Sequence, residues 1–332
     1  MIAVVVGLLY IFWSAVKLYV FGFLSLVRQV CQKHKAPSLS LHTHKVAIVT
    51  GGSSGIGFHV SKGLVAKNVH VIMAGESKDR GKRAINAIRE DFPNAKVDFM
   101  ELNLASFGSI KSFAEDFISL DIPLHILINN AGVMFKPYTL TEDGLEYHFQ
   151  VNYLGHLYLT DLLIGKLKES GANNSARIIN VSSIVHNVGR LDVKHLDKKL
   201  CHWWEYSSYA AYADSKLYIV LTSSWLDILL KEHNIMVNSL HPGIVNTSLY
   251  QYVPRCIKWL LDIVATFTYK VPMQGADTIL YLALSEDINS GNGYYDNCTY
   301  QKTCQIGYSL DTIEKLWDIS HVIINKHLPV QE

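Results

Sequence analysis

Features that would point to a disulfide scaffold, a metal site or a nucleic-acid surface are scarce in this sequence. Its 332 residues include only 5 cysteines, too few to staple a chain of this size, and they lack the paired spacing of a metal site. The 30 lysines and arginines are balanced by 29 aspartates and glutamates, which leaves a net charge of +1. We therefore expect a reducing compartment, no bound metal and no nucleic-acid partner.

Charge is also nearly missing from the N-terminal run at residues 2–27, where Lys17 is the only charged side chain. As a helix this run would be roughly 39 Å long, which exceeds the ~30 Å hydrocarbon core of a bilayer. A cleaved signal peptide is the alternative, but no charged segment precedes the run and no small-residue cleavage site follows a short core. The run therefore predicts a membrane helix.

Basic residues flank this helix on one side only. Arg28, Lys33 and Lys35 follow it and nothing basic precedes it, so the positive-inside rule predicts that the rest of the chain faces the cytosol. We expect an anchor with its basic flank at residues 1–35 and a linker at 36–44. In this interpretation the anchor only places the chemistry, which lies after the linker.

The remainder of the chain alternates between short apolar runs and amphipathic helical stretches. Such alternation predicts βαβ units and a parallel sheet covered by helices on both faces, and continuous apolar strands fit that burial. We expect a single α/β domain, a doubly wound parallel sheet of the Rossmann type, at residues 45–305, followed by a helical extension at 306–332. The expected strands are Val46–Thr50, Val69–Ala74, Val97–Leu102, His125–Asn129, Arg177–Val181 and Met236–Leu240.

A glycine-rich turn, TGGSSGIG at residues 50–57, follows the first expected strand. A strand, a turn and a helix start bring bare backbone N–H groups and a helix N-terminus to one point, which suits a phosphate group. The spacing is G-x-x-x-G-x-G, not the commoner G-x-G-x-x-G of dinucleotide sites, and a plain turn is the alternative. The candidate pyrophosphate contacts are Gly51, Ser53, Ser54, Gly55, Ile56 and Gly57.

The ends of the next strands carry further candidate cofactor contacts. Glu76 follows the second strand, where a carboxylate accepts hydrogen bonds from ribose hydroxyls and repels a 2′-phosphate, so NAD is favoured and NADP stays possible. Lys78 and Arg80 weaken this inference, and a solvated loop glutamate is the alternative. The other candidates are Asn103 and Leu104 at the adenine, and Asn130, Ala131 and Gly132, whose small size lets the backbone approach a cofactor.

Tyr212 and Lys216 form the clearest catalytic pair in the sequence. Residues four apart share one face of a helix, so both side chains can reach one site. The ammonium is expected to lower the pKa of the tyrosine hydroxyl, which could then exchange a proton with an alcohol or carbonyl. The pair alone is common on helix surfaces; its combination with the glycine turn and with Ser182-Ser183 at the end of the fifth strand indicates a catalytic site.

These motifs resemble the short-chain dehydrogenase/reductase family over roughly residues 44–300. The resemblance implies that Tyr212 is the catalytic base, that Lys216 also binds the ribose, and that Ser183 polarises the substrate oxygen. It implies that Asn152 keeps a water in a proton relay. The loop HPGIVNT at residues 241–247 is similar to the family segment that holds the nicotinamide, with contacts from Pro242, Gly243, Val245 and Thr247.

The sequence departs from the family pattern at two places. Asn103 stands where the family usually has aspartate, which bears on adenine contacts. Ser183 and Tyr212 are 29 residues apart, more than is usual, so we expect an inserted segment at roughly His186 to Ser208 beside the active site.

Within the family, the N-terminal anchor and the segments AGVM (131–134), YLGH (153–156) and NTSLY (246–250) look most like the membrane-associated retinol-dehydrogenase branch. This implies a lipid alcohol or its aldehyde as substrate, most simply a long-chain isoprenoid, at the endoplasmic reticulum membrane or a lipid droplet. Retinol or a steroid alcohol is the alternative. A catalytically idle dinucleotide-binding regulator is a third reading, which the intact Ser183, Tyr212 and Lys216 argue against. The oligomeric state, including a homodimer, stays open.

A second apolar stretch follows the nicotinamide loop. Basic residues bracket this stretch, as in a helix at a membrane interface. The basic residues are Arg255, Lys258 and Lys270, and the apolar ones are Trp259, Leu260, Leu261, Ile263, Val264, Phe267 and Tyr269. An ordinary core helix of a substrate lid is the alternative.

Overall fold

The protein is built on one eight-stranded sheet with the order β3-β2-β1-β4-β5-β6-β7-β8. The computed structural model describes residues 2–173, 175–193, 196, 205–252, 268–303 and 307–328. Neighbouring strands are parallel except β8, which runs antiparallel to β7. The strands are β1 Val46–Thr50, β2 His70–Gly75, β3 Val97–Glu101, β4 Ile126–Asn129, β5 Ala176–Val181, β6 Ile235–His241, β7 Gly293–Asp296 and β8 Thr299–Tyr300.

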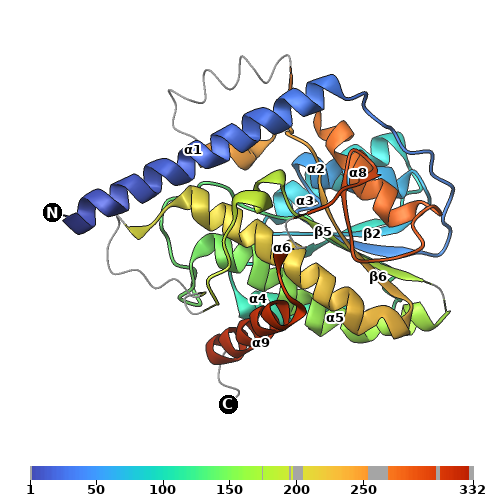
Figure 1. The fold of residues 1–332 in the computed structure, drawn as a ribbon. Coiled ribbons are helices and arrows are strands. Elements are labelled where there is room, and N and C mark those ends of the chain that lie inside the picture. Colours follow the sequence, from blue (N-terminus) through green and yellow to red (C-terminus); the bar gives the residue numbers. More distant parts are fainter. Residues whose placement is uncertain are drawn as a thin grey trace.

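Helices cover both faces of this sheet (Figure 1). Alternate strand residues divide between two cores: Ala47 and Val49 pack with the helices of one face, Val46 and Ile48 with those of the other. One face carries α2 Gly55–Val65, α3 Lys78–Asp91 and α8 Pro272–Leu284, and the other α4 Phe107–Ser119, α5 Gly155–Asn173 and α6 Ser208–Leu230, with α9 Leu310–His327 packed outside α6. Short helical turns are η1 Phe149–Leu154, η2 Ile184–Val188, η5 Lys231–His233 and η6 Ser248–Tyr252.

The predicted α/β fold is therefore confirmed, with each of the six expected strands present to within one residue at either end. The sequence did not predict the edge pair β7 and β8. These strands are short, and their turn places Asn297 and Cys298 at positive φ, 49° and 55°, without the glycine that usually marks such a turn.

The strand order reverses between β1 and β4, whose chain connections leave in opposite directions. In open α/β sheets ligands bind outside the carboxyl ends of the strands at such a switch point. The glycine turn after β1 and the Asn-Ala-Gly segment after β4 both lie there.

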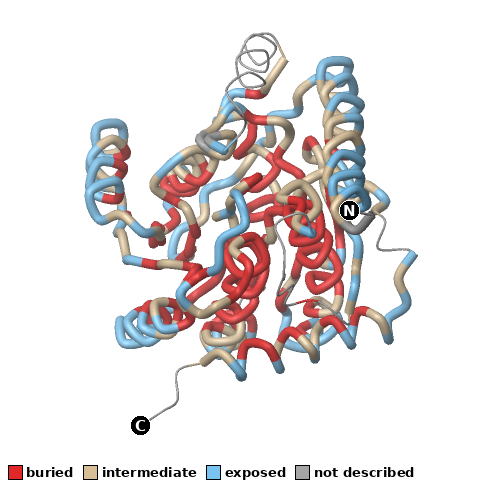
Figure 2. Tube along the Cα trace, turned by 90° about the vertical axis from the view of Figure 1, so that its left-hand side faces the viewer, coloured by how far each residue is buried: buried red, intermediate tan, exposed pale blue. Residues whose placement is uncertain are grey.

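The apolar N-terminal run forms α1, Ile2–Cys31, and is long and apolar enough to cross a membrane. Its second half lies against η2 and α6 on the body of the protein, and its inner side is partly covered. Large apolar side chains on its outer side are exposed, including Phe12, Trp13, Phe23 and Leu24. Figure 2 shows this helix, which starts at the N label, mostly in the colours of exposed and intermediate residues.

Two predicted segments lie largely outside the described residues. Of the expected insertion at His186 to Ser208, the structure describes η2 and its sequel to residue 193, residue 196 and residues 205–208. Of the stretch from Arg255 to Lys270, it describes only residues 268–270.

Candidate active site

A cavity of about 650 Å³ opens at the carboxyl ends of the parallel strands. It brings together nearly all of the site residues predicted from the sequence, drawn from the segments after β1 to β6, from the start of α2 and from α6. Those that line it are Gly51, Ser53, Ser54, Gly55, Ile56, Gly57, Glu76, Leu104, Asn130, Ala131, Gly132, Ser183, Tyr212, Lys216, Pro242, Gly243, Val245 and Thr247.

The turn after β1 has the geometry of a phosphate cradle. Gly51 and Gly55 adopt φ values of +65° and +53°, where side chains other than glycine are strained. A Cβ on Gly57 would lie 2.3 Å from the Gly51 carbonyl oxygen, so the close approach of turn and helix needs a bare backbone there. Ser54, the N-cap of α2, makes no side-chain cap, so its side chain does not compete for the first amides of the helix.

The hydroxyl of Thr50 joins this turn to the segment after β4. Its Oγ1 accepts hydrogen bonds from the backbone N–H groups of Asn130 and Ala131, at 2.9 and 3.0 Å, and lies 2.9 Å from His156 Nε2. His156 Nδ1 in turn lies 3.1 Å from the backbone oxygen of Asn152, which can only accept. His156 therefore carries its proton on Nδ1 and accepts from Thr50 through Nε2, and its burial lowers its pKa to about 4, so it is neutral.

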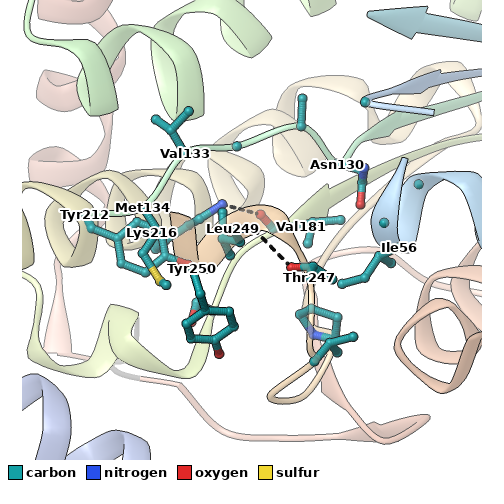
Figure 3. Close-up of a pocket in the computed structure, with 18 of the residues that line it drawn as sticks. Ile56, Asn130, Val133, Met134, Val181, Tyr212, Lys216, Thr247, Leu249 and Tyr250 are labelled. Atoms are coloured by element: carbon teal, nitrogen blue, oxygen red, sulfur yellow. Dashed lines mark hydrogen bonds between the residues drawn. The ribbon is translucent and has the colours of Figure 1, made fainter. Parts of the chain in front are cut away.

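Ser183, Tyr212 and Lys216 converge at one end of the cavity. Ser183 and Tyr212 line the same end of the cavity, and the Tyr212 ring centroid is 5.9 Å from Lys216 Nζ. Lys216 Nζ donates to the backbone oxygen of Val181 at 2.9 Å, as Figure 3 shows. Tyr212 and Lys216 are each only 4% exposed.

The expected lowering of the tyrosine pKa by Lys216 is not what this structure has. Burial raises the pKa of Tyr212 to about 12, against a smaller opposing effect of the Ser183 hydrogen bond. The same burial lowers the pKa of Lys216 to about 7. Desolvation disfavours the charged form of both groups.

Two predicted residues do not line this cavity. The Asn103 side chain accepts from the Ala105 N–H at 2.9 Å and so closes its own turn. Asn152, fully buried in η1, accepts from the Val133 N–H at 2.8 Å and donates to the Val133 oxygen and to Ser215 Oγ, each at 3.0 Å. Its side chain holds the segment after β4 against α6, and it borders a separate small cavity behind that segment.

The wall of the cavity after β2 carries charges of both signs. Glu76, which is exposed, and Arg80 both line it. Lys78 is instead paired with Glu101 at 3.0 Å, outside the cavity. Of the two cations that weakened the sequence argument for NAD, only Arg80 therefore lies in the cavity wall.

The loop after β6 is held from an unexpected direction. Gly243 has φ +92°, and the side-chain amide of Gln29 in α1 accepts from the Ile244 N–H at 2.8 Å and donates to the oxygens of Ile244 and Thr268, at 3.2 and 3.0 Å. Residues 1–35 thus contact the loop after β6, which the sequence did not predict. No local pattern signals Gln29, because its partners are more than 200 residues away.

The sequence also missed a buried polar cluster near Tyr212. The Tyr206 hydroxyl donates to Glu146 Oε1 at 2.7 Å, and the same oxygen lies 2.7 Å from His148 Nδ1. His148 Nε2 accepts from the Lys136 N–H at 3.2 Å, so the proton lies on Nδ1. The His148 and Tyr212 rings are 6.4 Å apart. This cluster anchors the described end of the expected insertion beside the site.

Comparison with known proteins agrees with this geometry. The short chain dehydrogenase family matches residues 45–194. A polyprenol dehydrogenase of Danio rerio is 37% identical, over 96% of this chain and 98% of its own length. Retinol dehydrogenase 11 of Mus musculus is 39% identical, over 83% of this chain and 85% of its own length.

Among solved structures, an uncharacterised protein of Mycobacterium paratuberculosis aligns with a TM-score of 0.69 and 26% identity, covering 90% of this chain and 100% of that one. The Danio rerio relative matches nearly end to end, and most of the site residues on which the resemblance rested meet in one cavity. The chain belongs to the short-chain dehydrogenase family.

Proposed function

We propose that this protein is an NAD(P)-dependent dehydrogenase that interconverts a lipid alcohol and its aldehyde or ketone. The observation that carries the proposal is the convergence of Ser183, Tyr212 and Lys216 at one end of a cavity whose other end is the glycine turn. Among the described residues, no group of three or more histidine, cysteine, aspartate or glutamate side chains could hold a metal ion.

Tyr212 is the proposed proton acceptor for alcohol oxidation and donor for the reverse reaction. Ser183 lines the same end of the cavity, and its hydroxyl would orient the substrate oxygen. Since the pKa of Tyr212 is raised, loss of its proton needs a positive charge nearby, which Lys216 would supply in its protonated form. In this proposal Asn152 is a positioning residue, because it binds the segment that carries Gly132. That segment lies close to the lysine: a Cβ built on Gly132 would be 3.6 Å from Lys216 Nζ.

The residues at the other end fit a nicotinamide dinucleotide. The turn after β1 suits a pyrophosphate because it ends at the N-terminus of α2 and contains glycines at positive φ. At Gly57 a Cβ would also collide with the turn. When bound, the dinucleotide would accept or supply the hydride. We propose NAD as the preferred form because the Glu76 carboxylate would accept from ribose hydroxyls and repel a 2′-phosphate. Arg80, which lines the same cavity, could pair with such a phosphate and so keeps NADP as the alternative.

A polyprenol or its aldehyde is the proposed substrate. Similarity to a polyprenol dehydrogenase over nearly the whole chain supports it, and apolar side chains beside Tyr212, among them Met134, Phe135 and Leu249, suit a hydrocarbon chain. Retinol is the second candidate, because retinol dehydrogenase 11 of Mus musculus is equally similar over a shorter stretch.

We further propose that α1 anchors the protein at the endoplasmic reticulum membrane or a lipid droplet, with the body in the cytosol. The length and apolar outer side of α1 and the basic residues after it support this placement. The proposed division of the chain is anchor 1–35, linker 36–44, dehydrogenase domain 45–305 and helical extension 306–332.

One assay tests the proposal directly. Purified full-length protein in detergent is offered polyprenol, retinol and a steroid alcohol, each with NAD or NADP, and reduced cofactor is measured. We expect reduction with polyprenol and NAD above all, and none with Tyr212→Phe. No reduction with any pair, from protein that still binds NADH, would leave the idle dinucleotide-binding role as the better account.

A further inference from the structure

The inner side of α1 is part of the cavity wall. Leu18, only 6% exposed, belongs to the same apolar cluster as Met134, Phe135 and Tyr212. Gly22, Phe23 and Leu26 on the next turns also line the cavity. The helix is therefore in contact with the neighbourhood of Tyr212, which a simple tether would not require.

Aromatic contacts continue from α1 to that tyrosine. The rings of Tyr19 and Tyr209 are 5.7 Å apart, those of Tyr209 and Phe135 4.7 Å, and those of Phe135 and Tyr212 5.8 Å. Aromatic pairs at these separations are favourable packing contacts. The helix is thus packed against the substrate end of the cavity.

Polar contacts fix the C-terminal end of α1 and its sequel. Gln29 makes the three hydrogen bonds to the segments at Ile244 and Thr268 described above. His34 lies 2.7 Å from Asp277 of α8, and Asn297 donates to the backbone oxygen of Lys33 at 3.0 Å. These bonds fix the end of α1 to the body of the protein, so Gly22 and Leu26 have a defined position in the cavity wall.

The outer side of the same turns is apolar and exposed. Val20, Leu24 and Val27 are 51%, 57% and 45% exposed, and Phe23 lines the cavity although it is 65% exposed. Phe23 therefore stands at the rim, with the cavity on one side and the outer face of α1 on the other. An apolar helical face of this extent is suited to contact with hydrocarbon.

We propose that the stretch of α1 from Leu18 to Leu26 is a binding wall for the hydrocarbon chain of the substrate, and that the chain passes from the bilayer into the cavity beside Phe23. This inference rests on the proposed action on a lipid alcohol and adds where the lipid chain lies. It makes the membrane helix a determinant of substrate choice as well as an anchor.

Gly22 offers a clean test, because a Cβ built there has no atom within 4 Å and its φ lies outside the positive region. Gly22→Ala and Gly22→Leu add volume on the cavity side without backbone strain, and both residues favour a helix more than glycine does. Gly165→Leu in α5 is the matched control, since it too has no atom within 4 Å of its Cβ but does not line the cavity.

The measurements are kcat/KM for a long polyprenol and for a short water-soluble isoprenoid alcohol, together with the Kd for NADH. We expect Gly22→Leu to lower kcat/KM for polyprenol about tenfold or more, Gly22→Ala to lower it less, and both to leave the short alcohol and NADH binding within about twofold. Gly165→Leu should match wild type throughout. If the short alcohol is turned over too slowly, the Kd for NADH of each variant is compared with that of wild type to show that the variant is folded.

Different failures overturn different statements. An unchanged polyprenol kcat/KM in Gly22→Leu, or an equal loss for both alcohols or in NADH binding, overturns the wall while leaving the proposed function standing. Wild-type protein that binds NADH yet oxidises no lipid alcohol overturns the proposed function, and the wall falls with it.

Discussion

Replacing Thr50 by valine should be costly, although valine has nearly the same shape. The substitution removes one hydroxyl that accepts from two backbone N–H groups, of Asn130 and Ala131, and pairs with His156 Nε2. A typical hydrogen bond contributes a net ~1 kcal/mol, and a buried group left unpaired costs about 1–3 kcal/mol.

The magnitude follows from where the three partners lie. Thr50 and His156 are buried, so Nε2 loses its partner in a dry place, whereas Asn130 and Ala131 are partly exposed to the cavity, where water can reach their amides. We therefore expect Thr50→Val to lower the free energy of unfolding by about 2–4 kcal/mol. For a chain of this size that corresponds to a fall in melting temperature of roughly 4–8 °C.

Activity should fall with stability, because the same hydroxyl positions the segment that carries Gly132 beside Lys216. Thr50→Ser is the matched control: it keeps the hydroxyl and loses one methyl group, at about 1 kcal/mol. The assay is a thermal melt in detergent with kcat/KM on the same samples. If Thr50→Val melts within about 1 °C of wild type, or if Thr50→Ser is the worse of the two, the network does not have the importance argued here.

Three further outcomes are expected. Tyr212→Phe should lower kcat by about 10²–10⁴ while the Kd for NADH stays nearly unchanged, and activity within a few-fold of wild type would remove Tyr212 from proton transfer. Glu76→Arg should move the ratio of kcat/KM for NAD over NADP toward NADP by about one to two decades; an unchanged ratio would remove Glu76 from the cofactor site. Burial lowers the pKa of Lys216 to about 7 in the folded protein, so between pH 7 and about 10 the unfolded chain binds the extra proton and stability from this group rises with pH, by about 1.4 kcal/mol per unit at most. Lys216→Met should flatten the rise of melting temperature over pH 7–9.5, and a slope identical to wild type would show that Lys216 titrates normally.

Local sequence was sufficient for the sheet and for the polar residues at its carboxyl edge. Apolar runs and breaks in them report burial on both faces, and every connection from β1 to β6 includes a helix, so strands Val46–Thr50 to Met236–Leu240 could be predicted nearly to the residue. The cavity residues after those strands followed, because parallel strands end at one edge. β7 and β8 escaped prediction since short edge strands carry little periodic signal.

The tertiary structure alone decided how these residues are used. The side chain of Asn103 is hydrogen-bonded within its own loop, and that of Asn152 is hydrogen-bonded to Val133 and Ser215. Burial reverses the expected shift in the pKa of Tyr212, because desolvation depends on every neighbour and not on the residue four positions away.

The N-terminal helix shows the same division. Its composition was enough to predict an apolar helix of membrane-spanning length, since hydropathy and length are local properties. That Gln29 holds the loop at Ile244, and that Gly22 faces the cavity of Tyr212, depends on contacts across about 200 residues of chain. Such contacts leave no periodic trace in the sequence, so only the folded arrangement brings α1 against the cavity.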